Sequence, residues 1–331
     1  MEGKEEICAS DIISILHKAS GQYVSGEYLS KCLGITRTAV WKRIGVLKKE
    51  GYNIEASTRK GYRLVSPDLP YGKAAIQQHL NTRLFGRSME FFREIDSTNN
   101  YLKRLANEGA AEGTVVVADC QIQGRGRLGR GWVSEPGQGI WMSVLTRPCL
   151  HPNDVQIFTL AASAAVCNAL DAFGISGMGI KWPNDIMING KKVCGILTEL
   201  AAEAERVLWV VTGIGINVNQ LSFPTEIESI ATSLRLNAGS QDVLDRSRLA
   251  AMILNELEII YNKFIESGAE IIIDNWKRWN ITLGKRVRLV FKGESLEATA
   301  YDILSDGRLV AIKDDGTKLE AVSGEISLRE V

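Results

Sequence analysis

The chain has 331 residues, of which 24% are charged and 45% hydrophobic, with 39 basic and 39 acidic side chains. This composition excludes an intrinsically disordered protein, and the lack of an apolar run of about 18 residues argues against a membrane span. The first residues lack the basic flank and apolar stretch of a signal peptide, so we expect a cytoplasmic protein without a membrane partner. The length fits two or three domains.

The net charge of zero conceals a basic segment near the start of the chain. Residues 25–66 contain nine basic and three acidic side chains, so this segment carries a charge of +6 and the remainder a charge of −6. The six cysteines and three histidines are not spaced as in zinc sites or redox motifs, and the common hydrolase, metalloprotease and P-loop patterns are absent. The basic segment is therefore the first candidate for a binding function.

The first elements predict a helix-turn-helix. An apolar face predicts a helix over residues 6–19, and Ser25 can cap a second helix that ends at Gly34. Thr36 can cap a third helix, Arg37–Glu50, whose apolar residues recur on one face. Two short helices joined by a tight turn are typical of motifs that place the second helix in the major groove of DNA.

A basic hairpin follows the third helix. Two short strands, residues 52–56 and 62–65, flank a basic tip at residues 57–61, so the motif is predicted to be winged. A small helical domain with a solvated charged face is the alternative, but the order of the elements and the basic wing favour DNA binding. The first domain is placed at residues 1–66, and its candidate DNA contacts are Arg37, Thr38, Lys42, Arg43, Arg59 and Lys60.

A linker containing two prolines, residues 67–74, leads into a large central domain at residues 75–280. Strands are predicted over 89–95, 114–118, 140–145, 186–188, 193–200 and 207–211, and helices over 97–108, 155–173 and 248–264. The dipeptide Asn189-Gly190 is a strong hairpin signal. Hairpins without regular alternation of strands and helices favour a mixed sheet over a parallel one.

The segment Gly124–Trp132 alternates glycine with arginine and formally fits the dinucleotide-binding pattern G-x-G-x-x-G. That pattern requires a helix to begin within it, and the glycines and the proline that follow make such a start unfavourable. A loop with three guanidinium groups, from Arg125, Arg127 and Arg130, is instead suited to fold over an anionic ligand. A merely solvated loop is the less favoured alternative.

Two further segments add charge and glycine near strand ends. Lys181–Asp185 supplies a cation, a carboxylate and an amide, and the predicted hairpin folds Lys192 back beside it. Gly213–Asn217 follows a buried strand, and its glycines permit a close approach of the backbone to a ligand. Together with the arginine loop, these segments predict a pocket for a polyanionic nucleotide.

The last domain, residues 281–331, is predicted to be a small antiparallel β-barrel. Its apolar or alternating stretches predict strands over 287–291, 296–303, 309–312 and 318–322. The dipeptides Asp306-Gly307 and Asp315-Gly316 supply the hairpin turns.

The sequence resembles the bifunctional biotin–protein ligases that also act as biotin operon repressors. The resemblance is carried by the winged helix, Asp96–Asn99, Gly124–Trp132, Lys181–Asp185, Lys192–Ile196 and Gly213–Asn217. It implies an α+β protein with an N-terminal winged helix-turn-helix, a central mixed-sheet catalytic domain like that of class II synthetases, and a C-terminal SH3-like barrel.

The activity that the resemblance implies has two steps. Biotin and ATP, with Mg²⁺, form biotinyl-5′-AMP and pyrophosphate, and the biotinyl group then passes to a lysine of a biotin carboxyl carrier domain from acetyl-CoA carboxylase or a related carboxylase. The adenylate-bound protein is expected to form a homodimer that binds operator DNA and represses genes of biotin synthesis or transport.

The resemblance also implies a role for each matching residue. The residues expected at the biotin end are Ser97, Thr98, Asn99 and Gln121, and those expected in the loop over biotin and the adenylate are Arg125, Gly126 and Arg127. Lys192 is expected beside the biotin carboxylate and the α-phosphate, with Gly195 in the same site and Asn184, Asp185 and Asn217 towards ATP and its metal. The candidate catalytic residues are Lys192, Arg125, Asp185 and Lys181, and Asp185 is the candidate metal ligand.

Two alternatives stay open. The first is a lipoate or octanoyl transfer enzyme of the same superfamily, against which the winged helix and Lys181–Asp185 argue. The second is a transcription regulator whose centre only senses a ligand, against which Lys192 and the two loop arginines, Arg125 and Arg127, argue.

Overall fold

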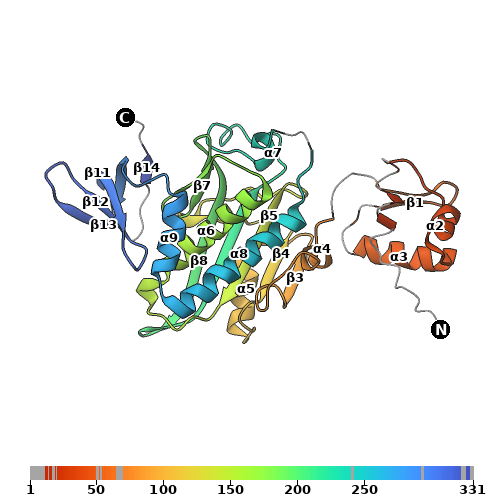
Figure 1. The fold of residues 1–331 in the computed structure, drawn as a ribbon, viewed down its shortest axis with the longest axis horizontal. Helices are drawn as coiled ribbons and strands as arrows, with labels where there is room; N and C mark the ends of the chain where they lie inside the picture. The colour runs from red at the N-terminus through yellow and green to blue at the C-terminus, as the bar shows by residue number, and fades with distance from the viewer. Residues whose placement is uncertain are drawn as a thin grey trace.

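The structure, a computed structural model, describes residues 12–13, 15–16, 19, 21–49, 52, 54–64, 70–239, 242–291, 294–321 and 326–328. Figure 1 shows three units that follow one another along the chain: a small helical unit with a hairpin, a large sheet covered by helices, and a small sheet. Most of the helix predicted over residues 6–19 lies outside the described residues.

The N-terminal unit contains helices α2 (Gly26–Leu33) and α3 (Arg37–Lys49) and the hairpin of β1 (Ile54–Ser57) and β2 (Gly61–Leu64). The predicted helix caps are confirmed, because the Ser25 hydroxyl accepts the Tyr28 N–H at 3.1 Å and the Thr36 hydroxyl accepts the Ala39 N–H at 3.2 Å. The turn between the helices is closed by Gly34, whose φ of 61° is the left-handed conformation that glycine adopts without strain. A separate apolar core holds this unit together; its buried members are Ile12, Leu16, Leu29, Leu33, Val40, Ile44, Leu47, Ile54 and Leu64.

The central unit is built on a seven-stranded sheet with the order β3-β4-β5-β9-β8-β7-β6. Its strands are β3 (Met89–Phe92), β4 (Val115–Ala118), β5 (Gly139–Thr146), β6 (Met178–Lys181), β7 (Asp185–Ile188), β8 (Lys191–Glu203) and β9 (Arg206–Asn217). Strands β3 and β4 are parallel and all other neighbours are antiparallel, so the predicted mixed sheet is confirmed.

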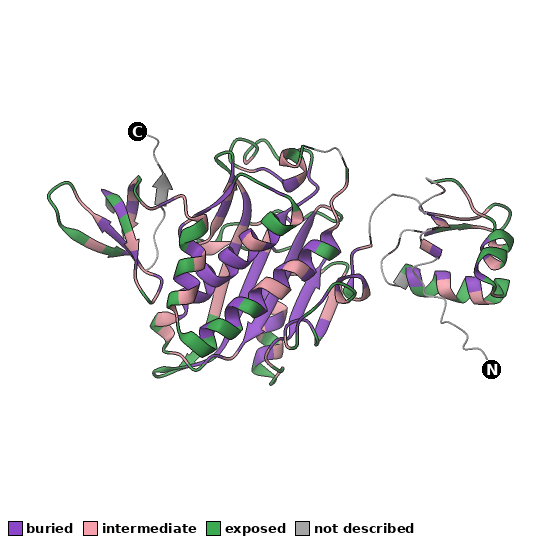
Figure 2. Cartoon of the chain, in the orientation of Figure 1, coloured by how far each residue is buried: buried purple, intermediate pink, exposed green. Residues whose placement is uncertain are grey.

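Helices cover both faces of this sheet. Helices α6 (Gln156–Phe173), α8 (Arg246–Ser267) and α9 (Glu270–Trp279) share the main apolar core, whose strands and inner helix faces are buried (Figure 2). Helix α5 (Thr98–Asn107) packs with β4, β5 and β9 over a second, smaller core. One stretch, residues 152–173, is long and apolar enough to cross a membrane, but 78% of its most apolar window is buried, as in the core helix of a globular domain.

The central unit begins within the segment predicted to be a linker. Tyr71 is buried in the main core, and the Ser247 hydroxyl donates to the Pro70 carbonyl at 2.6 Å. The short helix α4 (Lys73–Gln77) spans the predicted boundary between residues 74 and 75 and packs against α8. The chain is therefore anchored to the centre from Pro70 onwards.

The C-terminal unit is a five-stranded antiparallel sheet with the order β13-β12-β11-β10-β14. Its strands are β10 (Arg286–Phe291), β11 (Glu294–Ile303), β12 (Leu309–Ile312), β13 (Lys318–Ala321) and β14 (Ile326–Leu328). It is tied to the centre where the Trp182 indole N–H donates to the Gly307 carbonyl at 3.0 Å and where Lys277 pairs with Asp302 at 2.7 Å. The hydrogen bond from Trp182 to Gly307 places the tip of the β11–β12 hairpin next to the Lys181–Asp185 segment.

Candidate active site

A cavity of about 830 Å³ opens at the sheet of the central unit. It is surrounded by the start of α5, the arginine-rich loop, the β6–β8 hairpins and the end of β9. All of the residues predicted for the ligand and catalytic site line it, namely Ser97, Thr98, Asn99, Gln121, Arg125, Gly126, Arg127, Lys181, Asn184, Asp185, Lys192, Gly195 and Asn217. Its volume suits a ligand of nucleotide size.

A buried polar network forms one end of the cavity. Ser97 caps α5, and this turn aims the Thr98 N–H and hydroxyl at the side-chain oxygen of Gln121, at 2.8 and 3.1 Å. Gln121 in turn donates to the Ser134 hydroxyl at 3.2 Å. The Ser143 hydroxyl, fully buried on β5, lies 2.7 Å from Thr98 Oγ1. The donors and acceptors of this end are therefore held in fixed orientations.

Asn99 extends the network across the sheet. Its amide oxygen lies 2.5 Å from the Ser143 hydroxyl, and its amide N–H donates to the Glu199 carboxylate at 2.8 Å. Glu199 also pairs with Lys103 at 2.6 Å. A side chain at Gly213 would place its Cβ 2.2 Å from the Asn99 amide oxygen, so this glycine is what leaves room for Asn99.

A cationic cluster forms another part of the cavity lining. The Lys192 ammonium lies 2.5 Å from the Asp185 carboxylate, and Arg127 donates to the Asn184 side-chain oxygen at 3.2 Å. Asn184 is itself oriented by its bond to the Ile196 carbonyl at 3.0 Å. Lys181, half-buried on β6, completes the group. Partly buried cations of this kind are suited to hold an anionic ligand.

The β7–β8 hairpin explains why these charges meet. Asn189 (φ 50°) and Gly190 (φ 76°) both have left-handed backbone at the tip, as expected for a tight hairpin turn. The pairing is irregular between Ile186 and Met187, where the register shifts by a bulge before the Asp185–Gly195 pair. The predicted return of Lys192 to the Lys181–Asp185 strand is confirmed.

Burial lowers the pKa of two of these cations. It lowers the pKa of the Lys181 ammonium; Asp185 opposes this change and the charge on Lys192 adds to it. Burial likewise lowers the pKa of the Arg127 guanidinium, and Asp185 again opposes the change. The cavity thus gathers positive charge at a cost that an anionic ligand would relieve.

The segment Gly124–Trp132 folds back on itself. The Gly126 N–H donates to the Arg130 carbonyl at 2.7 Å and the Trp132 N–H to the Gly124 carbonyl at 2.9 Å, around a single 3-10 turn at Arg127–Gly129. The segment therefore forms a hairpin-like loop and does not begin the α-helix that a dinucleotide-binding motif requires. Arg125 is exposed at its edge and lines the cavity.

Trp132, at the end of this loop, was not among the predicted site residues. Its ring packs over two glycines that face each other on β8 and β9, since a Cβ at Gly195 or at Gly215 would lie 2.9 Å from the indole. The Lys192 ammonium lies 5.2 Å from the centre of the Trp132 ring. The indole N–H is buried and has no hydrogen-bond partner among the described residues. Trp132 therefore forms a flat wall with a donor left for a ligand.

Asn217 and Asp185 are among the residues predicted to lie towards ATP and its metal. The Asn217 amide donates to the Thr232 carbonyl at 3.1 Å and accepts from the Gln220 amide at 3.2 Å, so it fastens the chain after β9. Among the described residues there is no group of three or more histidine, cysteine or acidic side chains that could hold a metal by itself. A single carboxylate, Asp185, fits a Mg²⁺ that is bound mainly by substrate phosphates.

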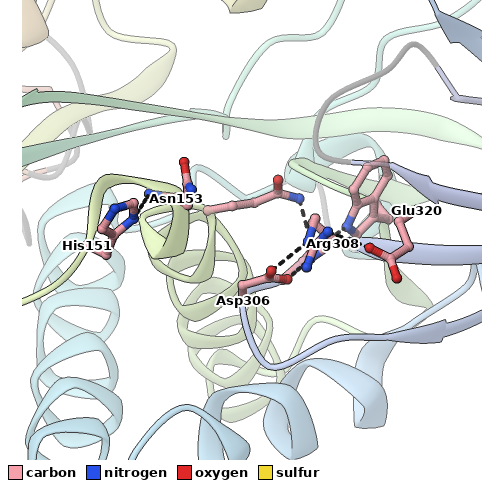
Figure 3. Close-up of polar contacts among 8 residues, drawn as sticks. His151, Asn153, Asp306, Arg308 and Glu320 are labelled. Carbon is pink, nitrogen blue, oxygen red and sulfur yellow. Dashed lines mark hydrogen bonds and ion pairs between the residues drawn. The ribbon is translucent and has the colours of Figure 1, made fainter. Parts of the chain in front are cut away.

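A second cavity of about 600 Å³ adjoins the first at Arg127 and Pro183. It lies between the start of α6 and the C-terminal sheet, and its floor carries the hydrogen-bonded hydroxyls of Thr159 and Thr198. Arg308 lines its far side and pairs with Asp306 at 2.5 Å and with Glu320, as Figure 3 shows. The C-terminal unit thus contributes one wall of this cavity.

The predicted DNA contacts lie on two elements of the N-terminal unit. Arg37, Thr38 and Lys42 are exposed on α3, whereas Arg43 is half-buried with one guanidinium nitrogen fully buried. The remaining predicted contacts, Arg59 and Lys60, lie at the exposed turn of the β1–β2 hairpin.

Three models of known protein families match the chain, one in each of its three units. Residues 9–63 match the family model of an HTH domain, residues 91–217 that of the biotin/lipoate A/B protein ligase family, and residues 282–329 that of the biotin protein ligase C-terminal domain. The chain is similar to biotin protein ligase from Aquifex aeolicus in complex with biotin and ATP, with a TM-score of 0.62 and 31% identity over 74% of this chain and 100% of that one.

Curated relatives extend the similarity over the whole chain. The bifunctional ligase/repressor BirA of Bacillus spizizenii is 41% identical over 93% of this chain and 92% of its own length, and that of Escherichia coli is 30% identical over 98% of each. The biotin–[acetyl-CoA-carboxylase] ligase of Mycobacterium tuberculosis is 36% identical over 67% of this chain and 82% of its own. The chain therefore belongs to the biotin–protein ligases, among the bifunctional members that join a ligase to a repressor.

Proposed function

We propose that this protein activates biotin with ATP and transfers it to a lysine of a carboxylase carrier domain. In the first step a biotin carboxylate oxygen attacks the α-phosphorus, and the bond to the pyrophosphate leaving group breaks. In the second step the lysine amine attacks the acyl carbon of biotinyl-5′-AMP, AMP leaves, and an amide bond forms. The observation that carries the proposal is one cavity that is lined both by a polar network and by a group of cations.

The polar end suits the head group of biotin. The ureido ring has two N–H donors and a carbonyl acceptor. The buried Thr98 and Asn99 side chains and the partly buried Gln121 side chain present complementary groups. A lipoyl dithiolane or an octanoyl chain has no such polar groups and would gain no hydrogen bonds from this network. This difference favours biotin over the lipoate or octanoyl alternative.

The cationic end suits the reacting anions. The biotin carboxylate and the ATP phosphates repel each other, and Lys192, Arg125, Arg127 and Lys181 are the cations that offset this repulsion. The α-phosphorus gains negative charge as the new bond forms, and fixed cations stabilise that charge without reorganising. A Mg²⁺ bound with ATP would add to this stabilisation, and Asp185 is the carboxylate proposed to approach it.

Two parts of the structure support the second step. The arginine-rich loop and Trp132 line the cavity, and a loop ordered over the ligand would exclude water from a mixed anhydride that hydrolyses readily. The second cavity meets the first at Arg127 and Pro183, which makes it the proposed entry for the acceptor lysine. The C-terminal sheet, proposed to be an SH3-like barrel on a class II synthetase-like centre, would then help to bind the carrier domain.

The regulatory activity is assigned to the N-terminal unit. The adenylate-bound chain is proposed to form a cytoplasmic homodimer whose two winged helices bind half-sites of operator DNA and repress genes of biotin supply. The domain limits at residues 66 and 280 stay part of this proposal, whereas the central unit is taken to begin at Pro70 and not after residue 74. Deleting residues 1–66 should abolish binding to DNA while ligation persists. Retained sequence-specific binding by the shortened chain would contradict this assignment.

The substrate is tested by exchange of labelled pyrophosphate into ATP, which reports the first step alone. Exchange should require biotin and should not be supported by lipoate or octanoate. Exchange with lipoate but not with biotin would replace the proposal by the lipoate alternative. Exchange with none of the three would favour a regulator that only senses a ligand.

A further inference from the structure

Helix α3 exposes a tryptophan to solvent. The side chain of Trp41 is 65% exposed, more than that of any other tryptophan among the described residues. The rest of the helix packs as its apolar pattern requires, with Val40, Ile44 and Leu47 buried in the core of the N-terminal unit. Trp41 is not a member of the core that the described residues of the N-terminal unit form, and tryptophan is a residue that commonly anchors a binding partner.

A glycine lies one helical turn beyond Trp41. Gly45 is exposed in the interior of α3, where glycine stabilises a helix less than alanine does. A Cβ built at Gly45 would meet no atom of the chain within 4 Å. The described part of the protein therefore offers no steric reason for this glycine, and residues four apart lie on the same face. The exposed indole ring of Trp41 therefore lies beside a position, Gly45, at which the helix carries no side chain.

Charged side chains around this face favour a polyanionic partner. Arg37, Lys42 and Lys48 are exposed on the same helix, and none of its residues from Arg37 to Lys49 is acidic. Thr38, one turn before Trp41, adds a hydroxyl. A protein partner would bury such cations only with acidic groups opposite, whereas a DNA groove is lined by phosphates throughout.

We propose that Trp41 and Gly45 determine which DNA sequence α3 reads, with the indole against the 5-methyl group of a thymine in the major groove. Apolar side chains distinguish thymine by this methyl group. Gly45 lets the helix backbone approach the base edges, because a side chain there would project into the groove. The inference rests on the proposed repressor activity and extends it by naming a residue that reads bases.

The test uses the full-length protein with biotin and MgATP. A pool of random-sequence duplexes is first used to select the DNA that the wild-type protein prefers, and single thymines in that duplex are then replaced by deoxyuridine, which lacks the methyl group. Affinities are measured for the wild type, Trp41→Ala, Gly45→Ala and Tyr301→Ala. Tyr301, 61% exposed on β11, is the matched control for the loss of an exposed aromatic side chain.

The wild type should lose about fourfold in affinity at one or two deoxyuridine positions, the value expected for one buried methyl group. Trp41→Ala should lose at least about fourfold on the thymine duplex and nothing more at those positions, because the two changes remove the same contact. Gly45→Ala should bind more weakly although its melting temperature is not lowered. Tyr301→Ala should bind as the wild type does.

Two results would overturn the inference and leave the repressor activity intact: unchanged binding by Trp41→Ala, or an undiminished deoxyuridine penalty in that variant. A wild-type protein that selects no sequence from the pool would instead refute the repressor activity, and the inference with it. The two failures are therefore distinguishable.

Discussion

The Lys192 ammonium lies 2.5 Å from the Asp185 carboxylate, across the neighbouring strands β8 and β7. Both side chains are about one quarter to one third exposed, so the pair lies at the wall of the cavity and not within the core. Such an exposed pair contributes little to stability. Its value is positional, because the carboxylate holds the ammonium towards the ligand space.

Replacing Lys192 by alanine should slow adenylate formation about 100-fold or more, with little effect on folding. Removal of one group that stabilises transition-state charge typically lowers kcat by about 100-fold or more. The rate of biotin-dependent pyrophosphate exchange measures the loss, and the melting temperature reports the fold. Lys191→Ala is the matched control, since that exposed side chain bonds to the Glu228 carbonyl away from the cavity. Normal exchange in Lys192→Ala would remove Lys192 from the proposed chemistry.

Ser143→Ala should weaken biotin binding. The variant deletes the hydroxyl that lies between Thr98 and Asn99, and loss of one buried hydrogen-bonding group costs on the order of 1–2 kcal/mol, or about tenfold in Kd. Titration calorimetry with biotin measures this change. Ser163→Ala, which removes a buried hydroxyl bonded only within α6, should leave the Kd for biotin unchanged. Equal effects of the two substitutions would mean that the network does not position the ligand.

Gly215→Ala should disturb the wall formed by Trp132. The new Cβ would lie 2.9 Å from the indole, so the ring must move, and such overpacking costs about 1–3 kcal/mol. We expect a lower melting temperature and weaker retention of the adenylate. Filter binding with labelled ATP and biotin measures this retention. Gly45→Ala is the control, because its Cβ meets no atom within 4 Å. Adenylate retention unchanged in Gly215→Ala would show that Trp132 does not contact the ligand.

The lowered pKa of Lys181 makes stability depend on pH in a defined direction. As pH approaches the ordinary lysine value of about 10.4, the folded protein loses this proton before the unfolded chain does. The unfolded state then holds more protons, so stability rises with pH through this window. Relative to Lys181→Met, the wild type should gain melting temperature between neutral pH and about 10.4. A difference between the two proteins that stays constant with pH would contradict the lowered pKa.

Local signals in the sequence sufficed for most of the elements. The caps at Ser25 and Ser97 and the Asn189-Gly190 turn were predicted because one or two side chains decide each of them. Helix α9 (Glu270–Trp279) was missed, although its apolar residues are spaced for a helix, and helix α4 is too short to carry a pattern.

The residues that line the cavity were only partly predictable from the sequence. Motif residues such as Lys192 were found because charge and glycine mark them along the chain. Ser143 and Glu199 were not, because their roles depend on which strands are neighbours, and the packing of Trp132 over Gly195 and Gly215 depends on the register of β8 with β9. A polar residue inside the apolar strand Gly139–Thr146 was the one local hint of Ser143.

The most direct measurement of the central claim is transfer of label to an acceptor. The full-length protein is mixed with labelled biotin, ATP, Mg²⁺ and a biotin carboxyl carrier domain, with a carrier whose acceptor lysine is replaced by arginine as the control. The account predicts ATP-dependent label on the carrier lysine, none on the control carrier, and an initial rate at least about 100-fold lower with Lys192→Ala. An unlabelled carrier, with wild-type protein that is folded and binds biotin, would contradict it.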